Sequence, residues 1–328
     1  MTTVTIHSCA ELEEALFGRP MTAPRGRLRT HQYLLRGLAR AEYPLLTNLQ
    51  RLGPNAEQCE YHLLRNFQKY APRFVSRASS IWHWLAIAQH HGLPTRLMDW
   101  TASPYVAMHF ATVDDSSAAY DGAIWAVDFV EVHRHLPKDF VKVLDEVGSN
   151  VFSVEMITRV APKMEALANG RTPEFVLFLE PPSIDDRIVN QFSLFSLPSC
   201  CRITFEELMM RIGASCTKFV IPSELKGQIR SRLDQGNVTE RTLFPGLDGI
   251  SAWLKRRYSL VAEPGSESTP RSAKSAAKPR KKAHKSKTKA SDSRKTKALP
   301  RSSGKSARPS AKKPTDLRKS RVVPKKRG

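Results

Sequence analysis

The spacing of apolar residues along the first 262 positions predicts a succession of helices and strands. Helices repeat apolar residues every three to four positions, whereas half-buried strands alternate apolar and polar residues. These patterns predict helices over residues 9–17, 55–70, 79–92 and 223–235, others beginning near Ser103 and Thr204, and a last one within 244–258. They predict strands over residues 31–39, 95–100, 122–130, 174–180, 187–197 and 218–222.

Capping residues support several of these helix boundaries. Ser8 and Glu11 have the spacing of a capping box, and Asn55 is a favourable residue to begin the helix that follows it. Gly92 is a typical C-terminal glycine, and Pro94 indicates that its helix has ended. The segment "RIVNQFSLFSL" (187–197) alternates at period two and predicts one continuous strand.

The order of these elements predicts the fold class. Helices and strands mix irregularly, without the regular alternation of a doubly wound sheet and without an internal repeat. We therefore predict an α+β fold, with a single mixed-sheet globular domain over residues 1–262. A domain of that size buries roughly three quarters of its unfolded surface.

Charge separates the end of the chain from this domain. Residues 263–328 hold 23 Lys and Arg against 4 Asp and Glu, a net charge of +19 within the chain total of +21, and they contain no aromatic residue. A segment rich in Lys, Arg, Ala, Pro and Ser buries too little apolar surface to fold, so we predict a disordered basic tail. Such a polycation binds phosphate backbones without sequence specificity and in a salt-dependent way. Solubilisation and attraction to an anionic membrane are the alternatives.

Other functional classes lose support from the sequence. The five cysteines contain no CxxC pair, the N-terminus lacks a signal-peptide pattern, and no apolar run approaches about 20 residues. We expect a cytoplasmic protein, associated with the nucleoid through its tail, with no membrane contact. The histidines reproduce no zinc spacing, so no metal is predicted, and both the nucleophile elbow and the phosphate-loop glycines are missing.

The segment "QHHGLPTRLMDWTASPYVAMHFA" (89–111) concentrates polar residues that a core element does not need. Three arginines, Arg36, Arg96 and Arg187, also lie in otherwise apolar segments, and Asp99 is a candidate partner for one of them. Buried charges require partners. They form either a structural ion-pair lattice or a cleft that receives a small anionic ligand.

These residues resemble the FRG domain, a bacterial family named for an aromatic-Arg-Gly signature. The resemblance covers about residues 30–255 and rests on "LAIAQHHGLPTRLMDWTASPYVAMHFA", "EPPSIDDRIVNQFSLF" and "TLFPGLDGISAWL". Leu35 replaces the aromatic residue of the signature, while Arg36 and Gly37 remain. This departure removes a stacking group from that position but leaves the arginine.

A weaker similarity is to the ADP-ribosyltransferase fold, and it implies NAD as the ligand. It places Arg36 on the first motif strand, Thr95 or Thr101 in the second motif and Gln191 in the third, where the catalytic acid stands. An amide is no general base near neutral pH, so Gln191 is a candidate catalytic residue only for altered chemistry. Trp100, Tyr105 and Phe110 are aromatic residues that are candidates to stack on the nicotinamide.

Two functions remain open at this point. The first is an NAD-using ADP-ribosyltransferase-like enzyme held on nucleic acid by its tail. The second is a non-catalytic module that binds a nucleotide or a protein and carries the same tail. Both use one predicted set of ligand-binding residues: Arg36, Gly37, Gln89, His90, Thr95, Arg96, Asp99, Thr101, Arg187 and Gln191.

Overall fold

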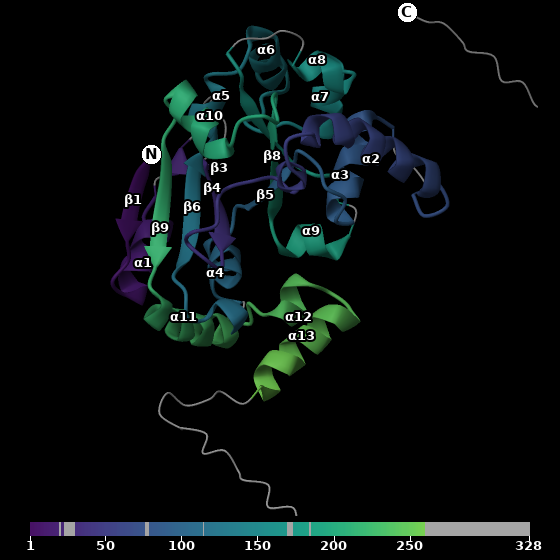
Figure 1. Cartoon of the computed structure of the whole chain (residues 1–328). Helices are drawn as coiled ribbons and strands as arrows, with labels where there is room; N and C mark the ends of the chain where they lie inside the picture. The colour runs from purple at the N-terminus through teal and green to yellow at the C-terminus, as the bar shows by residue number, and fades with distance from the viewer. Residues whose placement is uncertain are drawn as a thin grey trace, which may run out of the picture. The chain divides into compact units, whose positions relative to one another are not determined.

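The fold of this chain, taken from a computed structural model, is α+β with a seven-stranded mixed sheet, as predicted (Figure 1). The structure describes residues 1–19, 21–22, 30–75, 79–113, 115–168, 173–183 and 185–259. The disorder predicted for residues 263–328 lies outside these ranges. Among the described residues no helix is both long enough and apolar enough to span a membrane.

The strands of the large sheet follow the order β1-β9-β6-β4-β5-β8-β7, and a short pair, β2 and β3, lies outside it. The first pairing, β1 with β9, is parallel, and the other pairings in the large sheet are antiparallel. The strands are β1 (Thr2–Thr5), β2 (Met21–Thr22), β3 (Thr30–His31), β4 (Tyr33–Leu38), β5 (Met98–Thr101), β6 (Gly122–Asp128), β7 (Val176–Leu179), β8 (Ser193–Pro198) and β9 (Cys216–Ile221).

Helices cover both faces of the sheet. The helices are α1 (Cys9–Phe17), α2 (Ala56–Tyr70), α3 (Ile81–His90), α4 (Pro104–Thr112), α5 (Phe129–His133), α6 (Lys138–Val147), α7 (Val154–Val160), α8 (Met164–Ala168), α9 (Asp186–Asn190), α10 (Phe205–Ile212), α11 (Ser223–Gln235), α12 (Glu240–Leu243) and α13 (Leu247–Tyr258), with short 3-10 turns at Gln50–Leu52 and Asp115–Ser117.

Period-two alternation in the strands divides the core between the two faces. Leu34 and Trp125 pack with residues of α5 and α10, whereas their neighbours Leu35 and Ile124 pack with α1, α4 and α11. A third cluster joins α2, α3, α6 and α7 to the outer strands β7 and β8. The face that carries α1, α4 and α11 thus also carries the group α2, α3, α6 and α7. Between these two groups of helices, around β4, β5 and α9, a cavity forms.

Most predicted elements are confirmed. Ser8 caps α1 by accepting a hydrogen bond from the Glu11 N–H (3.1 Å), and Gly92, after α3, has a positive φ of 80°. Asn55 is the N-cap residue of α2, as predicted, although its side chain makes no capping hydrogen bond. Residue patterns gave no prediction for β1 and β2, for α5 to α8 or for α12.

The prediction of one continuous strand over residues 187–197 is wrong. Residues 186–190 form α9, and β8 begins only at Ser193. Asp185 starts the helix, since its carboxylate accepts hydrogen bonds from the N–H groups of Arg187 (2.9 Å) and Ile188 (3.2 Å). Phe192, with a φ of 48°, separates the helix from the strand. Arg187 and Gln191 therefore belong to a helix and its C-terminal cap.

Candidate functional site

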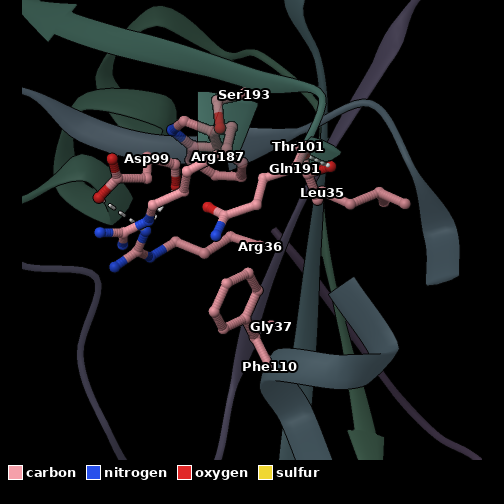
Figure 2. A pocket seen from close by; sticks show the side chains of 10 residues that line it. Leu35, Arg36, Gly37, Asp99, Thr101, Phe110, Arg187, Gln191 and Ser193 are labelled. Atoms are coloured by element: carbon pink, nitrogen blue, oxygen red, sulfur yellow. Dashed lines mark hydrogen bonds and ion pairs between the residues drawn. The ribbon is translucent and has the colours of Figure 1, made fainter. Parts of the chain in front are cut away.

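A pocket of about 170 Å³ lies where β4 and β5 separate within the sheet. These two strands share a single paired position, Leu35 with Thr101, so the backbone of β5 beyond it does not pair with β4. Side chains and backbone from β4, β5, α4, α9 and β8 line the space (Figure 2). The lining residues are Leu35, Arg36, Gly37, Asp99, Trp100, Thr101, Phe110, Arg187, Gln191 and Ser193.

Arg36 occupies the gap between the separated strands. Its Nη1 donates to the backbone carbonyl of Asp99 (2.5 Å) and lies 4.0 Å from the Asp99 carboxylate. Its Nε is buried and has no hydrogen-bond partner within the described part of the chain. Burial lowers the pKa of the Arg36 guanidinium, Asp99 opposes that effect and Arg51 adds to it. An arginine nevertheless stays charged in proteins, so the pocket holds a cation with an unused donor.

A chain of hydrogen bonds orients the Asp99 carboxylate. Gln89 donates from Nε2 to Asp99 Oδ2 (3.0 Å), and the Thr95 hydroxyl donates to Gln89 Oε1 (2.6 Å). The Thr95 oxygen in turn accepts from the N–H of Leu97 (3.1 Å). Two polar residues of the 89–101 segment, Gln89 and Thr95, therefore act together on the Asp99 carboxylate at the pocket wall.

Arg187 brings a second guanidinium to the pocket from α9. Its guanidinium carbon lies 5.0 Å from the centre of the Phe244 ring, which itself contacts Phe110 with ring centres 6.1 Å apart. Among the described residues, no carboxylate forms an ion pair with Arg187. In Figure 2 the side chains of Arg36 and Arg187 point toward the same end of the pocket as Asp99.

Gln191 is held in place by two hydrogen bonds. The Thr101 hydroxyl donates to its backbone carbonyl (2.7 Å), and its side-chain Nε2 donates to the carbonyl of Leu243 (2.9 Å). The Leu243 carbonyl fixes the Gln191 side chain, and because that side chain is an amide it offers no ionisable group to the pocket. The carboxylate available for chemistry in this wall is that of Asp99.

A second lobe of about 390 Å³ adjoins the pocket. The two share Asp99, Arg187, Gln191 and Ser193, and the second lobe adds Gln89, His90 and His91 with neighbouring residues Asn48, Gly92, Ile188 and Phe195. His90 contacts the carboxylate of Asp185 through Nε2 at 2.5 Å. The wall of this lobe is thus polar, with histidine and amide side chains.

Positive charge exceeds negative charge around the pocket. Arg36 and Arg187 face the single carboxylate of Asp99, and Arg51 is close enough to affect the pKa of Arg36. In the described ranges no cluster of His, Cys, Asp or Glu has the arrangement of a metal site. The arrangement of side chains suits an anion with additional polar groups.

Two of the predicted ligand-binding residues lie outside both lobes. Arg96 is 6% exposed and forms an ion pair with Glu60 at 2.6 Å, while Thr95 is fully buried. Arg96 therefore has the structural role that the ion-pair alternative predicted: through Glu60 it holds the segment just before β5 against α2. Arg36, Gly37, Asp99, Thr101, Arg187 and Gln191 meet in the first lobe, and Gln89 and His90 line the second.

The three aromatic residues predicted to stack on the nicotinamide have different locations in the structure. Phe110 and Trp100 both line the pocket, but Trp100 is a buried core residue whose indole N–H donates to Ser196 (2.9 Å). Tyr105 lies in a different groove. Sequence reasoning did not identify Phe244, which positions Arg187, because the two residues are far apart in the chain and no motif links them.

Comparison with known proteins identifies a family match. The family model of the FRG domain matches residues 31–119, which include Arg36, Gly37 and the whole 89–101 segment. No curated protein matches the chain, and no solved structure matches it.

Proposed function

Since residues 31–119 of this chain are an FRG domain, we propose that its pocket binds NAD or a closely related nucleoside diphosphate ligand. The observation that carries the proposal is the pair of guanidiniums at one end of the pocket. Arg36 keeps a buried Nε without an acceptor, and Arg187 has no carboxylate partner within the described residues. Arginine binds phosphate oxygens through charge-assisted, often bidentate hydrogen bonds.

The size and polarity of the two lobes fit such a ligand. Small-molecule sites measure roughly 300–1,000 Å³, and the lobes of about 170 and 390 Å³ together fall in this range. Arg36 and Arg187 would hold the pyrophosphate, and Phe110 offers an apolar ring in the first lobe. The amide and imidazole groups of the second lobe would meet hydroxyl or base nitrogen atoms.

A second candidate, ADP-ribosyl transfer, is favoured by Asp99 alone. NAD supplies an activated bond to ribose, and positive charge develops on the sugar as that bond breaks. A fixed carboxylate stabilises such charge only if it is already oriented, and Gln89 together with Thr95 orients Asp99. Gln191 supports binding without catalysis, because its amide cannot ionise.

The proposed macromolecular partner is nucleic acid, which the basic tail would bind. With a net charge of +19 over residues 263–328, it would neutralise phosphates along any nucleic acid and hold the domain there, on the nucleoid in a bacterial cell. The support for this part of the proposal is composition.

Two measurements on the full-length chain test this function. Added NAD is expected to raise the melting temperature, because a ligand that binds only the folded state stabilises it. Incubation with labelled NAD then separates the two candidates: transfer or hydrolysis that falls in Asp99→Asn without loss of NAD binding identifies an enzyme. Binding without turnover identifies a module, and the absence of any thermal shift would remove the pocket's proposed ligand.

A further inference from the structure

A separate open groove of about 780 Å³ lies on the other side of α9 from the pocket. It is formed by the start of α4, by α9 with the turn that follows it, and by the chain from Asn237 to Pro245. Figure 1 shows α9 facing α12 and α13 in this part of the molecule. The lining residues are Ser103, Tyr105, Val106, Asp186, Val189, Asn190, Phe192, Asn237, Val238, Arg241, Thr242, Leu243 and Pro245.

Backbone strain is concentrated in this groove. Within the described ranges, two non-glycine residues have a positive φ, Phe192 (48°) and Asn237 (58°), and both line it. Asparagine tolerates this conformation, whereas for a bulky residue such as phenylalanine it is an outlier. Strain of this kind persists mainly at ligand clamps and other functional sites. A glycine at position 192 would remove it.

The Phe192 ring contributes little core packing that could offset this strain, because 59% of the residue is exposed. Tyr105 also lines the groove and is 49% exposed, and its ring contacts Phe17 with 5.0 Å between ring centres. Val189, on the outer face of α9, is also largely exposed. Two largely exposed aromatic rings that line one open groove can stack against flat ligands.

Arginine side chains also lie at or near this groove. Arg241 lines the groove, and its guanidinium carbon lies 4.8 Å from the centre of the Trp253 ring. Arg257 approaches the same ring at 5.4 Å, near the end of α13. The sequence continues from α13 directly into the tail of net charge +19. Among the residues lining the groove, Asp186 is acidic and Arg241 is basic, so the cations available at this groove are Arg241 on α12 and its neighbour Arg257 on α13.

We propose that this groove binds one or two unpaired bases of a single-stranded nucleic acid, stacked on Phe192 and Tyr105. Exposed aromatic rings together with arginine side chains are a means by which proteins hold single strands without reading their sequence. A duplex keeps its bases stacked inside, so it can contact the tail but not these rings. The inference rests on the proposed function only in taking nucleic acid as a partner, and it adds a site and the single-stranded form.

The groove and the pocket are neighbours because consecutive residues of the chain line them. Gln191 lines the pocket, and its neighbours Asn190 and Phe192 line the groove. A single strand bound on Phe192 would therefore lie beside the anion-binding pocket. If the pocket transfers ADP-ribose, the bond between ribose C1′ and nicotinamide breaks and nicotinamide leaves, while an oxygen or nitrogen atom of the bound strand forms the new bond to C1′ and loses its proton to solvent.

The test compares single-stranded and duplex DNA binding by the full-length chain and its variants. Fluorescence anisotropy with a short oligothymidylate is expected to show about a tenfold weaker affinity for Phe192→Gly and for Tyr105→Ala, since stacking on one ring contributes that much per base. Affinity for a duplex of equal length, measured at the same salt concentration, stays unchanged. Tyr70→Ala is the matched control, because Tyr70 is an exposed aromatic residue on α2 outside the groove.

Phe192→Gly also guards against a folding artefact, because it relieves strain and is expected to raise the melting temperature while binding falls. NAD affinity should be unchanged in Phe192→Gly and reduced in Arg36→Gln, so a failure of the NAD proposal is seen separately. Equal single-strand affinity in the wild type and both groove variants would overturn the inference. An equal loss for single strand and duplex would overturn it too, because stacking does not predict it.

Discussion

The polar residues of the 89–101 segment have individual roles that explain why they interrupt an apolar region. Gln89 and Thr95 orient Asp99, and Thr101 fixes the backbone of Gln191. Arg96 instead forms a buried ion pair with Glu60. Sequence showed that these residues were unusual, but it did not show which belonged to a pocket, because Glu60 and Gln191 lie far away in the chain.

His109 is a buried residue whose titration should affect stability. Its Nδ1 accepts a hydrogen bond from Arg230 (2.9 Å), and its Nε2 is buried without a partner among the described residues. Burial, and then the charge of Arg230, lowers the pKa of His109 to about 4. Protonating it in the folded protein would bring a second positive charge against that arginine.

The folded protein should therefore lose stability in mildly acidic solution. Because the folded-state pKa lies below the unfolded value of about 6.5, this contribution is complete above pH 6.5 and declines as the pH falls toward 4. At pH 5 the loss is about 2 kcal/mol. Urea denaturation at pH 7 and pH 5 measures it, and His109→Gln should lose correspondingly less. Identical losses in both proteins would show that His109 does not titrate in this way.

At the scale of elements, periodicity and capping predicted most of the helices and strands but failed at α9. Residues 187–197 alternate as a strand should, yet Asp185 starts a short helix and Phe192 ends it with a positive φ. Neither effect appears in a hydrophobic pattern, since one is a local hydrogen bond and the other a strained backbone. This failure coincides with the wall between the pocket and the groove.

The packing of β4 against α4 makes a sharp prediction for Gly37. A Cβ at this position would lie 2.0 Å from the Ala107 carbonyl oxygen and 2.8 Å from the Ala111 nitrogen. Both atoms belong to the helix backbone, so α4 must move away. Gly37→Ala is expected to destabilise the protein by about 1–3 kcal/mol or more.

Gly227 provides the matched control for this substitution. It lies within α11, and a Cβ there would meet no atom within 4 Å. Gly227→Ala should leave stability unchanged or raise it by about 0.5–1 kcal/mol, as expected for alanine in a helix. Thermal or urea denaturation compares the two variants, and similar effects from both would contradict a packing role for Gly37.

At the scale of the whole molecule, the sequence predicted the fold class but not the order of the strands. The pocket unites Arg36 of β4, Asp99 of β5 and Arg187 of α9, and it exists because β4 and β5 pair at a single position. The family resemblance brought these segments together as candidates. Their actual meeting depends on long-range pairing that residue patterns do not encode.

The tail makes a prediction about the molecule's binding to duplex DNA. The logarithm of the affinity should fall linearly with the logarithm of the salt concentration, with a slope near −0.9 for each phosphate neutralised. A chain ending at residue 262 should lose most of this salt-dependent affinity while keeping its melting temperature. Equal DNA affinity with and without residues 263–328 would refute the role of the tail.

The central claim is that Arg36 and Arg187 form one anion-binding site, and calorimetric titration of the full-length chain with NAD and with ADP tests it most directly. Hydrogen bonds to charged groups contribute about 1.5–3 kcal/mol, so Arg36→Gln and Arg187→Gln should each weaken binding about ten- to a hundredfold. Arg65→Gln, which changes an exposed arginine of α2, should bind like the wild type. No measurable binding by the wild type, or equal affinity in all four proteins, would contradict the account.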